Sequence, residues 1–272
     1  MVRLRRAAIR VLDAINSVLS RRADRDFLLA RTLVFAPHPD DEVLGCGGTI
    51  LQKTQAGAQV WIVFMTDGGA SHPGMLPPGE LVATRRSEAI AAAMLLGLSA
   101  DRVTFLDFPD HALETHRPTA IDSVRALIAL HAPEDVLVPH AADRLPDHVE
   151  TNRVVAAALQ SGSRPVRILE YPVWLWHAWP WTPGRPGSGS GRMRDLAERL
   201  RDIWHLTFGC RVRVDVAAVV AMKRRALLAH RSQMERHGGD PRWPVLGDVA
   251  GGEFVSCFFS GTERFRQSGY RP

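Results

Sequence analysis

The stretch that decides the fold runs from Thr32 to Ile50 and reads TLVFAPHPDDEVLGCGGTI. Its first five residues, TLVFA, have the β-branched and apolar character of a strand buried on both faces of a sheet. A short polar segment follows, and helical spacing of apolar residues then extends from Val43 to Ala56. A buried strand that leads directly into a helix predicts the first unit of a parallel sheet covered by helices.

The same alternation continues along the chain. Further buried strands are expected at residues 59–65, 103–105, 135–139 and 166–171. Helices are expected between them, at residues 80–96, 119–130 and 149–160. This order predicts an α/β fold with a mainly parallel sheet and helices on both of its faces. Beyond it, the sequence predicts an edge strand at 210–214, a helix at 217–230 and a last strand at 254–259.

The composition is that of an ordinary globular protein. Hydrophobic residues make up 46% of the 272 residues and charged residues 23%, which suits one large domain with a sizeable core. No apolar run is long enough for a membrane-spanning helix, so the sequence excludes one. Cys46, Cys210 and Cys257 are too few and too scattered for a disulfide framework or a four-thiolate metal site. A reducing, cytoplasmic compartment is therefore expected.

The positive charge is confined to the N-terminal segment. The formal net charge of the whole chain is +5, and residues 1–25 alone carry this charge, because they hold seven arginines against Asp13 and Asp24. The remaining residues sum to about zero, which leaves no basic surface for a nucleic acid.

The same segment is predicted to form an amphipathic helix. Its apolar residues recur at helical spacing: Leu4, Ala8, Val11, Ile15 and Leu19. Such a helix packs on its domain, mediates self-association or lies on a membrane surface, and a targeting sequence is a further alternative. We expect a basic amphipathic helix at residues 1–28, a single domain at 29–272, and a homo-oligomer.

The segment from His38 to Glu42 is the first candidate for chemistry. One imidazole and three carboxylates lie within five residues at the carboxyl end of a buried strand, where ligands of such sheets bind. Like charges this close repel one another, and a bound cation is the usual reason to tolerate them. Imidazole and carboxylate ligands suit zinc or another divalent metal. The alternative without a metal is a helix that simply begins with acidic residues.

A second polar segment, Pro139–His148, follows the strand predicted at 135–139. In a parallel sheet both segments lie at the same edge. His38, Asp41 and His148 would then form a two-histidine, one-carboxylate site with an open position for water, as in catalytic zinc sites. Asp40 becomes the candidate general base for that water. Asp147, beside His148, is a candidate for supporting a ligand or handling a proton.

At this point the chain resembles the PIG-L/LmbE family of zinc-dependent N-acetylglucosaminyl deacetylases. The similarity spans roughly residues 30–260 and rests on six motifs: PHPDDEVLGCGGT (37–49), TDGGASHP (66–73), Arg85-x-x-Glu88, PDHAL (109–113), DRLPDH (143–148) and EYPVW (170–174). The resemblance implies a Rossmann-like three-layer sandwich. It also implies removal of an acetyl group from the N-acetylaminosugar of a glycoconjugate.

The resemblance also assigns roles to residues. It implies that His38, Asp41 and His148 bind Zn²⁺ and that Asp40 is the base. Arg85 and Asp110 fall where the family contacts the sugar or its aglycone. Without the resemblance, Arg85 and Glu88 are an exposed i,i+3 ion pair, and Asp110 is a turn residue.

One departure from the family pattern concerns Leu145. The family usually has histidine there, which is thought to stabilise the oxyanion and to protonate the leaving amine. The amine's proton would then come from Asp40 or Asp147, or from a histidine on another loop (His140, His111 or His177). The third alternative is a site that binds metal but turns over poorly. The competing functions are an amide hydrolase for a non-sugar or antibiotic conjugate and a metal- or glycan-binding protein of low activity.

The segment 174–181 holds four of the seven tryptophans: Trp174, Trp176, Trp179 and Trp181. Aromatic rings stack on sugars, which makes Trp174 and its neighbour His177 candidate substrate contacts. Packing of a lid or of an interface explains such a cluster equally well. The glycine-rich segment 184–192 is predicted to be a mobile loop. Core packing explains the helix that leads to His230 and Gln233, and no catalytic or binding role is assigned to it.

Overall fold

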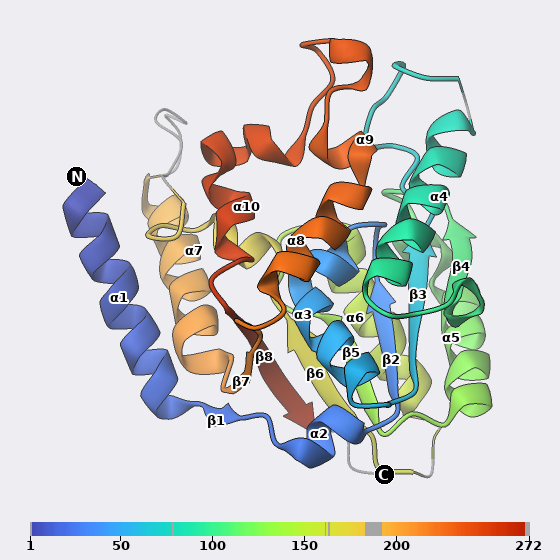
Figure 1. The fold of residues 1–272 in the computed structure, drawn as a ribbon, viewed down its shortest axis with the longest axis horizontal. Helices are drawn as coiled ribbons and strands as arrows, with labels where there is room; N and C mark the ends of the chain where they lie inside the picture. Colours follow the sequence, from blue (N-terminus) through green and yellow to red (C-terminus); the bar gives the residue numbers. More distant parts are fainter. Residues whose placement is uncertain (1, 78, 161, 163, 183–191, 270–272) are drawn as a thin grey trace.

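The computed structural model describes residues 2–77, 79–160, 162, 164–182 and 192–269. Eight strands form a sheet in the order β1-β7-β8-β6-β5-β2-β3-β4 (Figure 1). Their bounds are β1 Arg21–Arg22, β2 Thr32–Ala36, β3 Val60–Thr66, β4 Val103–Phe108, β5 Asp135–Pro139, β6 Arg167–Tyr171, β7 Val212–Asp215 and β8 Thr262–Gly269. The five strands from β4 to β6 run parallel, and β8 is antiparallel to both of its neighbours.

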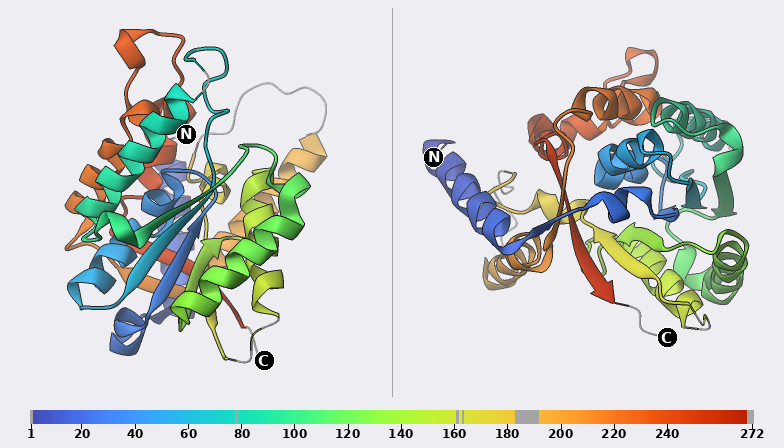
Figure 2. Two further views of the ribbon diagram at one scale, coloured as in Figure 1. Left: turned by 90° about the vertical axis from the view of Figure 1, so that its right-hand side faces the viewer. Right: turned by 60° about the horizontal axis from the view of Figure 1, so that its bottom comes forward.

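Helices cover both faces of the sheet. Their bounds are α1 Val2–Leu19, α2 Arg25–Leu29, α3 Asp41–Gln55, α4 Glu80–Leu95, α5 Arg117–His131, α6 Pro146–Leu159, α7 Arg192–Trp204, α8 Val220–Ala229, α9 Arg231–Met234 and α10 Glu253–Cys257. Alternate side chains of the buried strands pack into two separate apolar clusters, one with α3, α4, α8 and α10 and the other with α5 and α6. Figure 2 shows the sheet between these two layers, so the expected three-layer α/β fold is confirmed.

The connections around β2 create the crevice that holds the site. β2 pairs with β3 on one side and with β5 on the other. The chain therefore leaves β2 toward β3 and β4 and later returns across the sheet to β5 and β6. In such sheets the loops at this switch point diverge and leave a ligand crevice at the carboxyl ends of the strands. The segments that follow β2 and β5 are those that contain His38 and His148.

A close contact fixes the start of α3 against β6. A Cβ atom on Gly45 would lie 2.1 Å from Cδ2 of Tyr171, so only glycine fits here. The Tyr171 hydroxyl donates a hydrogen bond of 2.7 Å to the carbonyl oxygen of Phe35 in β2. Glycine thus lets α3 approach the sheet at the end of β6, and tyrosine ties that end to β2.

The predicted strands at 32–36 and 135–139 have the observed bounds, and the others differ by a few residues at their ends. The strand predicted at 254–259 is wrong, because these residues form α10 and the turn after it. Phe254, Val255 and Phe258 are buried there by helical rather than alternating spacing. The last strand is β8. The strand predicted at the sheet edge is β7, which lies between β1 and β8 and is not an edge.

The N-terminal residues form the predicted helix, α1. Residues 184–191 of the predicted mobile loop lie outside the described residues.

Candidate active site

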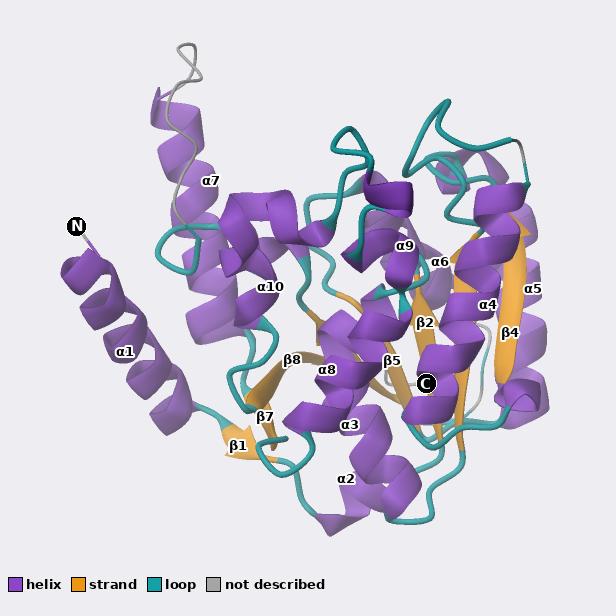
Figure 3. Ribbon diagram, turned by 45° about the horizontal axis from the view of Figure 1, so that its top comes forward, coloured by secondary structure: helices purple, strands orange, loops and turns teal. Residues whose placement is uncertain are grey.

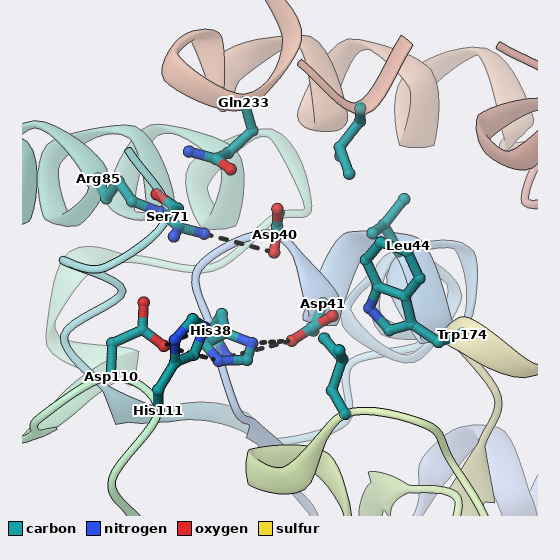
Figure 4. Close-up of a pocket in the computed structure, with 12 residues that line it drawn as sticks. His38, Asp40, Asp41, Leu44, Ser71, Arg85, Asp110, His111, Trp174 and Gln233 are labelled. Atoms are coloured by element: carbon teal, nitrogen blue, oxygen red, sulfur yellow. Dashed lines mark hydrogen bonds and ion pairs between the residues drawn. The ribbon is translucent and has the colours of Figure 1, made fainter. Parts of the chain in front are cut away.

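A hollow of about 500 Å³, including its open mouth, lies at the carboxyl ends of the parallel strands (Figure 4). Its lining comes from several loops: His38, Asp40, Asp41, Leu44, Ser71, Arg85, Asp110, His111, Leu145, Trp174, Gln233 and Leu246. Most of the residues singled out from the sequence therefore meet around one cavity. Figure 3 shows the segments after the strands gathered at this end of the sheet.

His38 lies at the centre of the polar cluster. Its Nδ1 atom is 3.2 Å from Oδ2 of Asp41. On the other side of the ring, Nε2 lies 3.1 Å from Oδ1 of Asp110 and 3.4 Å from Oδ2 of Asp147. Burial disfavours the charged imidazole, but these three carboxylates prevail and raise the pKa of His38 well above its ordinary value.

His148 faces His38 across Asp41. Its Nε2 atom is 3.2 Å from Oδ2 of Asp41, and its Nδ1 atom is 3.4 Å from Oδ2 of Asp143. Asp143 itself is held by the backbone N–H groups of Val173 and Trp174. Burial alone would lower the pKa of His148, but the carboxylates of Asp41 and Asp143 raise it to about 9.

The donor set of these residues fits a divalent metal ion. One ligand atom each from His38, Asp41 and His148 lies within 4.8 Å of the other two. Both ring nitrogens of His148 are buried and lack an aligned hydrogen-bond partner among the described residues. Buried polar atoms are seldom left in this state unless a ligand satisfies them. Two imidazoles and one carboxylate are the ligands that catalytic zinc sites use.

A second group of potential ligands is formed by His38, Asp110 and Asp147. Its two carboxylates are already engaged by backbone N–H groups: Asp110 accepts from Ala70, and Asp147 accepts from His111 and Leu113. A histidine that binds a metal through one nitrogen usually directs the other toward a carboxylate. The second group therefore fits the supporting side of His38 better than a second metal position.

Asp40 lies at the pocket wall with an unusual backbone. Its φ angle is 133°, a region that costs free energy for any residue except glycine. Oδ1 of Asp40 is 3.6 Å from Nη2 of Arg85. Burial raises the pKa of Asp40 to about 7, although the positive charge of Arg85 opposes the rise.

Glu42 and His230 hold the strained backbone of Asp40 in place. The backbone N–H of Asp40 donates to Oε2 of Glu42 at 2.9 Å. Oε1 of Glu42 lies 2.9 Å from Nε2 of His230, and both side chains are fully buried. Sequence reasoning missed this pair. The only signals were an additional carboxylate in the first motif and a histidine in a helix that the sequence analysis assigned to packing.

Arg85 is buried, so the alternative of an exposed ion pair with Glu88 is wrong. Its guanidinium donates hydrogen bonds to the carbonyl oxygens of Gly68 and Pro39, while Glu88 accepts bonds from Ser232. Arg85 thereby connects α4 with the loops after β2 and β3.

Asp110 is also more than a turn residue. Burial opposes its ionisation, but the interaction with His38 prevails and lowers the pKa of Asp110 to about 2. Asp110 thus stays ionised beside His38 at the pocket.

The tryptophan-rich segment divides into two roles. Trp174 lines the pocket and stacks on Phe254 with ring centroids 4.8 Å apart. Trp176 and Trp181 are buried and pack edge to face, which makes them part of the core. His177 lies in the short helix Trp174–His177, with its ring 6.2 Å from that of Phe254, and it is not among the residues that line the pocket.

Of the three histidines considered as replacements at Leu145, only His111 lines the same pocket as Leu145. His111 has a left-handed φ of 64° and a side chain that is 71% exposed. Figure 4 shows it among the residues that line the pocket. His140 instead packs edge to face on His205, and burial lowers its pKa to about 3. Gln233 and Leu246, which the sequence analysis did not select, complete the pocket wall.

Known proteins are similar to this chain in sequence. Residues 33–159 match the model of the PIG-L family, described as GlcNAc-PI de-N-acetylase. A 1D-myo-inositol 2-acetamido-2-deoxy-alpha-D-glucopyranoside deacetylase of Mycobacterium sp. (strain KMS) is 29% identical over 242 residues, covering 76% of this chain and 75% of the relative. A 2'-N-acetylparomamine deacetylase of Streptomyces fradiae is 27% identical over 251 residues, covering 81% of this chain and 83% of the relative.

A solved structure shares the fold over most of its length. The N,N'-diacetylchitobiose deacetylase from Pyrococcus horikoshii superposes with a TM-score of 0.62 at 23% identity, covering 94% of this chain and 92% of that chain.

Proposed function

We propose that this chain, whose residues 33–159 match the PIG-L family model, is a zinc-dependent hydrolase that removes the acetyl group from an N-acetylglucosamine-type aminosugar in a glycoconjugate. The curated relatives described above are deacetylases of N-acetylated aminosugars. They differ in what the aminosugar is attached to, so the aglycone is left open.

The observation that carries the proposal is the cluster of His38, Asp41 and His148. Their ligand atoms lie within 4.8 Å of one another beside a pocket of the size that a small molecule needs. A divalent ion held there supplies, when bound, a Lewis acid for the amide carbonyl and for a water molecule. The remaining steps belong to side chains of this chain.

Asp40 is the proposed general base. Its carboxylate accepts a proton from the water that adds to the amide carbon, and Arg85 stabilises the ionised form before the reaction. The Glu42–His230 pair fixes the backbone from which Asp40 projects. A base with a pKa near neutrality both accepts and releases a proton readily.

His111 is the proposed proton donor for the leaving amine. After water has added, the carbon–nitrogen bond breaks, the carboxyl product leaves as acetate, and the nitrogen takes a proton to become the free amine. Leu145 has no proton to give, whereas His111 lines the same pocket. Asp147, expected from the sequence to handle a proton, accepts the backbone N–H of His111 and lies 3.4 Å from Nε2 of His38. We assign it the positioning of these two histidines.

Substrate contacts are proposed for three residues at the pocket wall. Arg85 and Asp110 offer a donor and an acceptor for sugar hydroxyl groups, and Trp174 offers an aromatic face. The contact predicted for His177 is not carried further, because His177 does not line the pocket. A single domain at residues 29–272, a homo-oligomer and a cytoplasmic location stay predictions.

The test combines metal content with acetate release on one purified sample. The substrate panel contains the N-acetylglucosaminyl inositol, N,N'-diacetylchitobiose and 2'-N-acetylparomamine, with and without added zinc. We expect zinc-dependent acetate release from at least one of them. His38→Ala should lose both metal and activity. Asp40→Asn should keep the metal and lose activity by a factor of about 10³ or more.

His237→Ala serves as the matched control, because His237 is exposed outside the pocket and its loss should change neither readout. Equal metal loss in the Asp40 and His38 variants would contradict the assigned roles. Tightly bound metal without acetate from any member of the panel would favour the alternative of a metal- or glycan-binding protein.

A further inference from the structure

Exposed apolar side chains are concentrated on two helices at one edge of the molecule. Of the twelve large apolar side chains that are exposed in the described part of the chain, seven lie on α1 and α7: Leu4, Val11, Val18, Leu19, Leu196, Leu200 and Trp204. Figures 1 and 3 and the right-hand view of Figure 2 show these two helices at the same edge, away from α4 and α5. Such a concentration marks an interaction surface rather than scattered surface residues.

The inner face of α1 is tied to the body of the protein, which fixes the direction of its outer face. The side-chain amide of the buried Asn16 donates to the carbonyl oxygens of Leu206, Thr207 and Cys210 at 2.7–3.3 Å. Asp13 pairs with Arg264 of β8. The opposite face therefore points away from the core.

The outer face of α1 carries an uninterrupted apolar stripe. Leu4, Val11 and Val18 recur every seven residues, and the side chains of Leu4 and Val18 are 73% and 85% exposed. Ala7 and Ala14, both exposed, lie between them on the same face. At 18 residues the helix is about 27 Å long, enough to lie along a surface.

Arginines flank this stripe. Arg3, Arg6 and Arg10 are exposed, and none of them forms an ion pair with another described residue. The only acidic residue of α1 is Asp13, which is already paired with Arg264. A basic helix with one apolar face is the form that proteins use to lie on anionic bilayers.

We propose that the α1–α7 edge, defined by the outer face of α1 and by Leu196, Leu200 and Trp204 of α7, binds the surface of a membrane that contains anionic lipids. Lipid phosphates pair with the three arginines, and the apolar stripe enters the region below the headgroups. Trp204 is of the residue type that favours this depth. In the described part of the chain, none of the helices combines the length and apolarity that crossing a bilayer requires.

A second copy of the chain fits this edge less well. Two copies joined through the stripe would bring the arginines of both helices together without a free carboxylate on α1 to pair with them. Like charges that face one another in a helix pair oppose association. Anionic headgroups provide the missing negative charge. The proposal does not depend on the deacetylase activity.

The experiment measures co-sedimentation of the full chain with vesicles of equal parts phosphatidylglycerol and phosphatidylcholine, and with vesicles of phosphatidylcholine alone. We expect binding to the anionic vesicles that weakens as salt is raised. The triple variant Arg3→Gln/Arg6→Gln/Arg10→Gln should bind on the order of 100-fold more weakly, at about fivefold per arginine. The triple variant Leu4→Gln/Val11→Gln/Val18→Gln should also lose binding, because the stripe no longer enters the bilayer.

Matched controls change residues of the same types on other faces. Arg153→Gln with Arg224→Gln, and Met94→Gln with Leu130→Gln, should leave vesicle binding unchanged. Circular dichroism and thermal unfolding show whether each variant is folded. Absence of binding by the wild-type chain at low salt would overturn the proposal, and so would binding that the α1 variants do not weaken. Self-association that the same variants abolish, without vesicle binding, would assign the edge to a second copy instead.

Discussion

The two ends of the parallel strands both bury charged side chains, but these side chains differ in how completely they are paired. At the amino end, Lys53 of α3 is fully buried next to Asp135, the first residue of β5. At the carboxyl end, His38, Asp41 and His148 form a cluster in which neither ring nitrogen of His148 has an aligned hydrogen-bond partner among the described residues. The comparison distinguishes the Lys53–Asp135 pair, whose buried charges stabilise the fold, from the cluster at the carboxyl end, whose buried polar groups fit a bound ligand.

The amino end is a closed network. Nζ of Lys53 donates to Oδ2 of Asp135 at 2.9 Å and to the carbonyl oxygens of Phe27 and Ala30. Arg167 donates to both oxygens of the same carboxylate. All three N–H groups of the lysine have acceptors, and the carboxylate accepts three hydrogen bonds. These partners offset much of the cost of burying the two charges, although burial still lowers the pKa of Lys53.

The carboxyl end has three carboxylates within reach of one histidine and a second histidine without aligned partners. A metal-free protein tolerates this only through protonated imidazoles, whereas a divalent ion supplies the positive charge permanently. The two ends therefore predict opposite consequences of substitution: loss of stability at one and loss of function at the other.

At the carboxyl end, a loss of activity comparable to that of Asp40→Asn is expected for His111→Gln. If His111 gives its proton to the leaving amine, the variant should lose about 10²–10⁴-fold in kcat for amide substrates while metal content and thermal stability stay unchanged. Hydrolysis of p-nitrophenyl acetate should be nearly unaffected, because its phenolate leaves without protonation. Comparing kcat for the two substrate classes checks this.

A rescue experiment separates proton donation from packing at the same position. Leu145→His introduced into the His111→Gln variant should restore a large part of the amide activity, because it returns an imidazole to the same pocket. Loss of ester and amide hydrolysis to the same extent, with no recovery in the double variant, would remove His111 from the mechanism.

At the amino end, Lys53→Met should lower the free energy of unfolding by about 3 kcal/mol. The reason is that the buried carboxylate of Asp135 loses the positive charge of Lys53 and is left with Arg167 alone. Urea denaturation of the metal-free protein measures the change. Metal affinity and kcat of the folded fraction should equal those of the wild type. A Lys53 variant as stable as the wild type would show that the network adds nothing to stability.

A smaller effect is expected for Asp147→Asn. The backbone N–H groups of His111 and Leu113 donate to different oxygens of Asp147, Oδ2 and Oδ1. The single amide oxygen of asparagine keeps only one of these bonds, and the charge that faces His38 is lost. Metal affinity should fall about 10–100-fold, and the lost hydrogen bond should lower the free energy of unfolding by about 1 kcal/mol. Competition with a chelator measures the affinity, and Asp122→Asn, on the exposed side of α5, is the matched control. An unchanged metal affinity would show that Asp147 does not position the metal ligand His38.

The sequence was sufficient to predict which loops meet at the site. Alternating strands and helices placed His38 and His148 at the same sheet edge before any coordinates, because parallel strands end together. The Glu42–His230 pair was not predictable, since it joins residues 188 positions apart and no local pattern links them. The strand predicted at 254–259 failed for a related reason: a short apolar run fits a strand and a buried helix equally well.

His140 gives the smallest prediction and tests whether an unpartnered nitrogen alone marks a ligand site. Its Nε2 is buried without a partner among the described residues, as in His148, yet no carboxylate faces it within ion-pair distance there. Burial lowers the pKa of His140 to about 3, with His205, Arg266 and Arg201 adding to the effect.

The unfolded chain takes up the proton near pH 6.5, so it binds more protons than the folded chain between these two pKa values. The free energy of unfolding should therefore fall as the pH drops below 6.5, and His140→Asn should remove about 2 kcal/mol of that loss at about pH 5. Urea unfolding of both proteins at neutral and acidic pH measures the difference. Identical pH dependence in the two proteins would mean that His140 is solvated or partnered in solution, and the contrast with His148 would disappear.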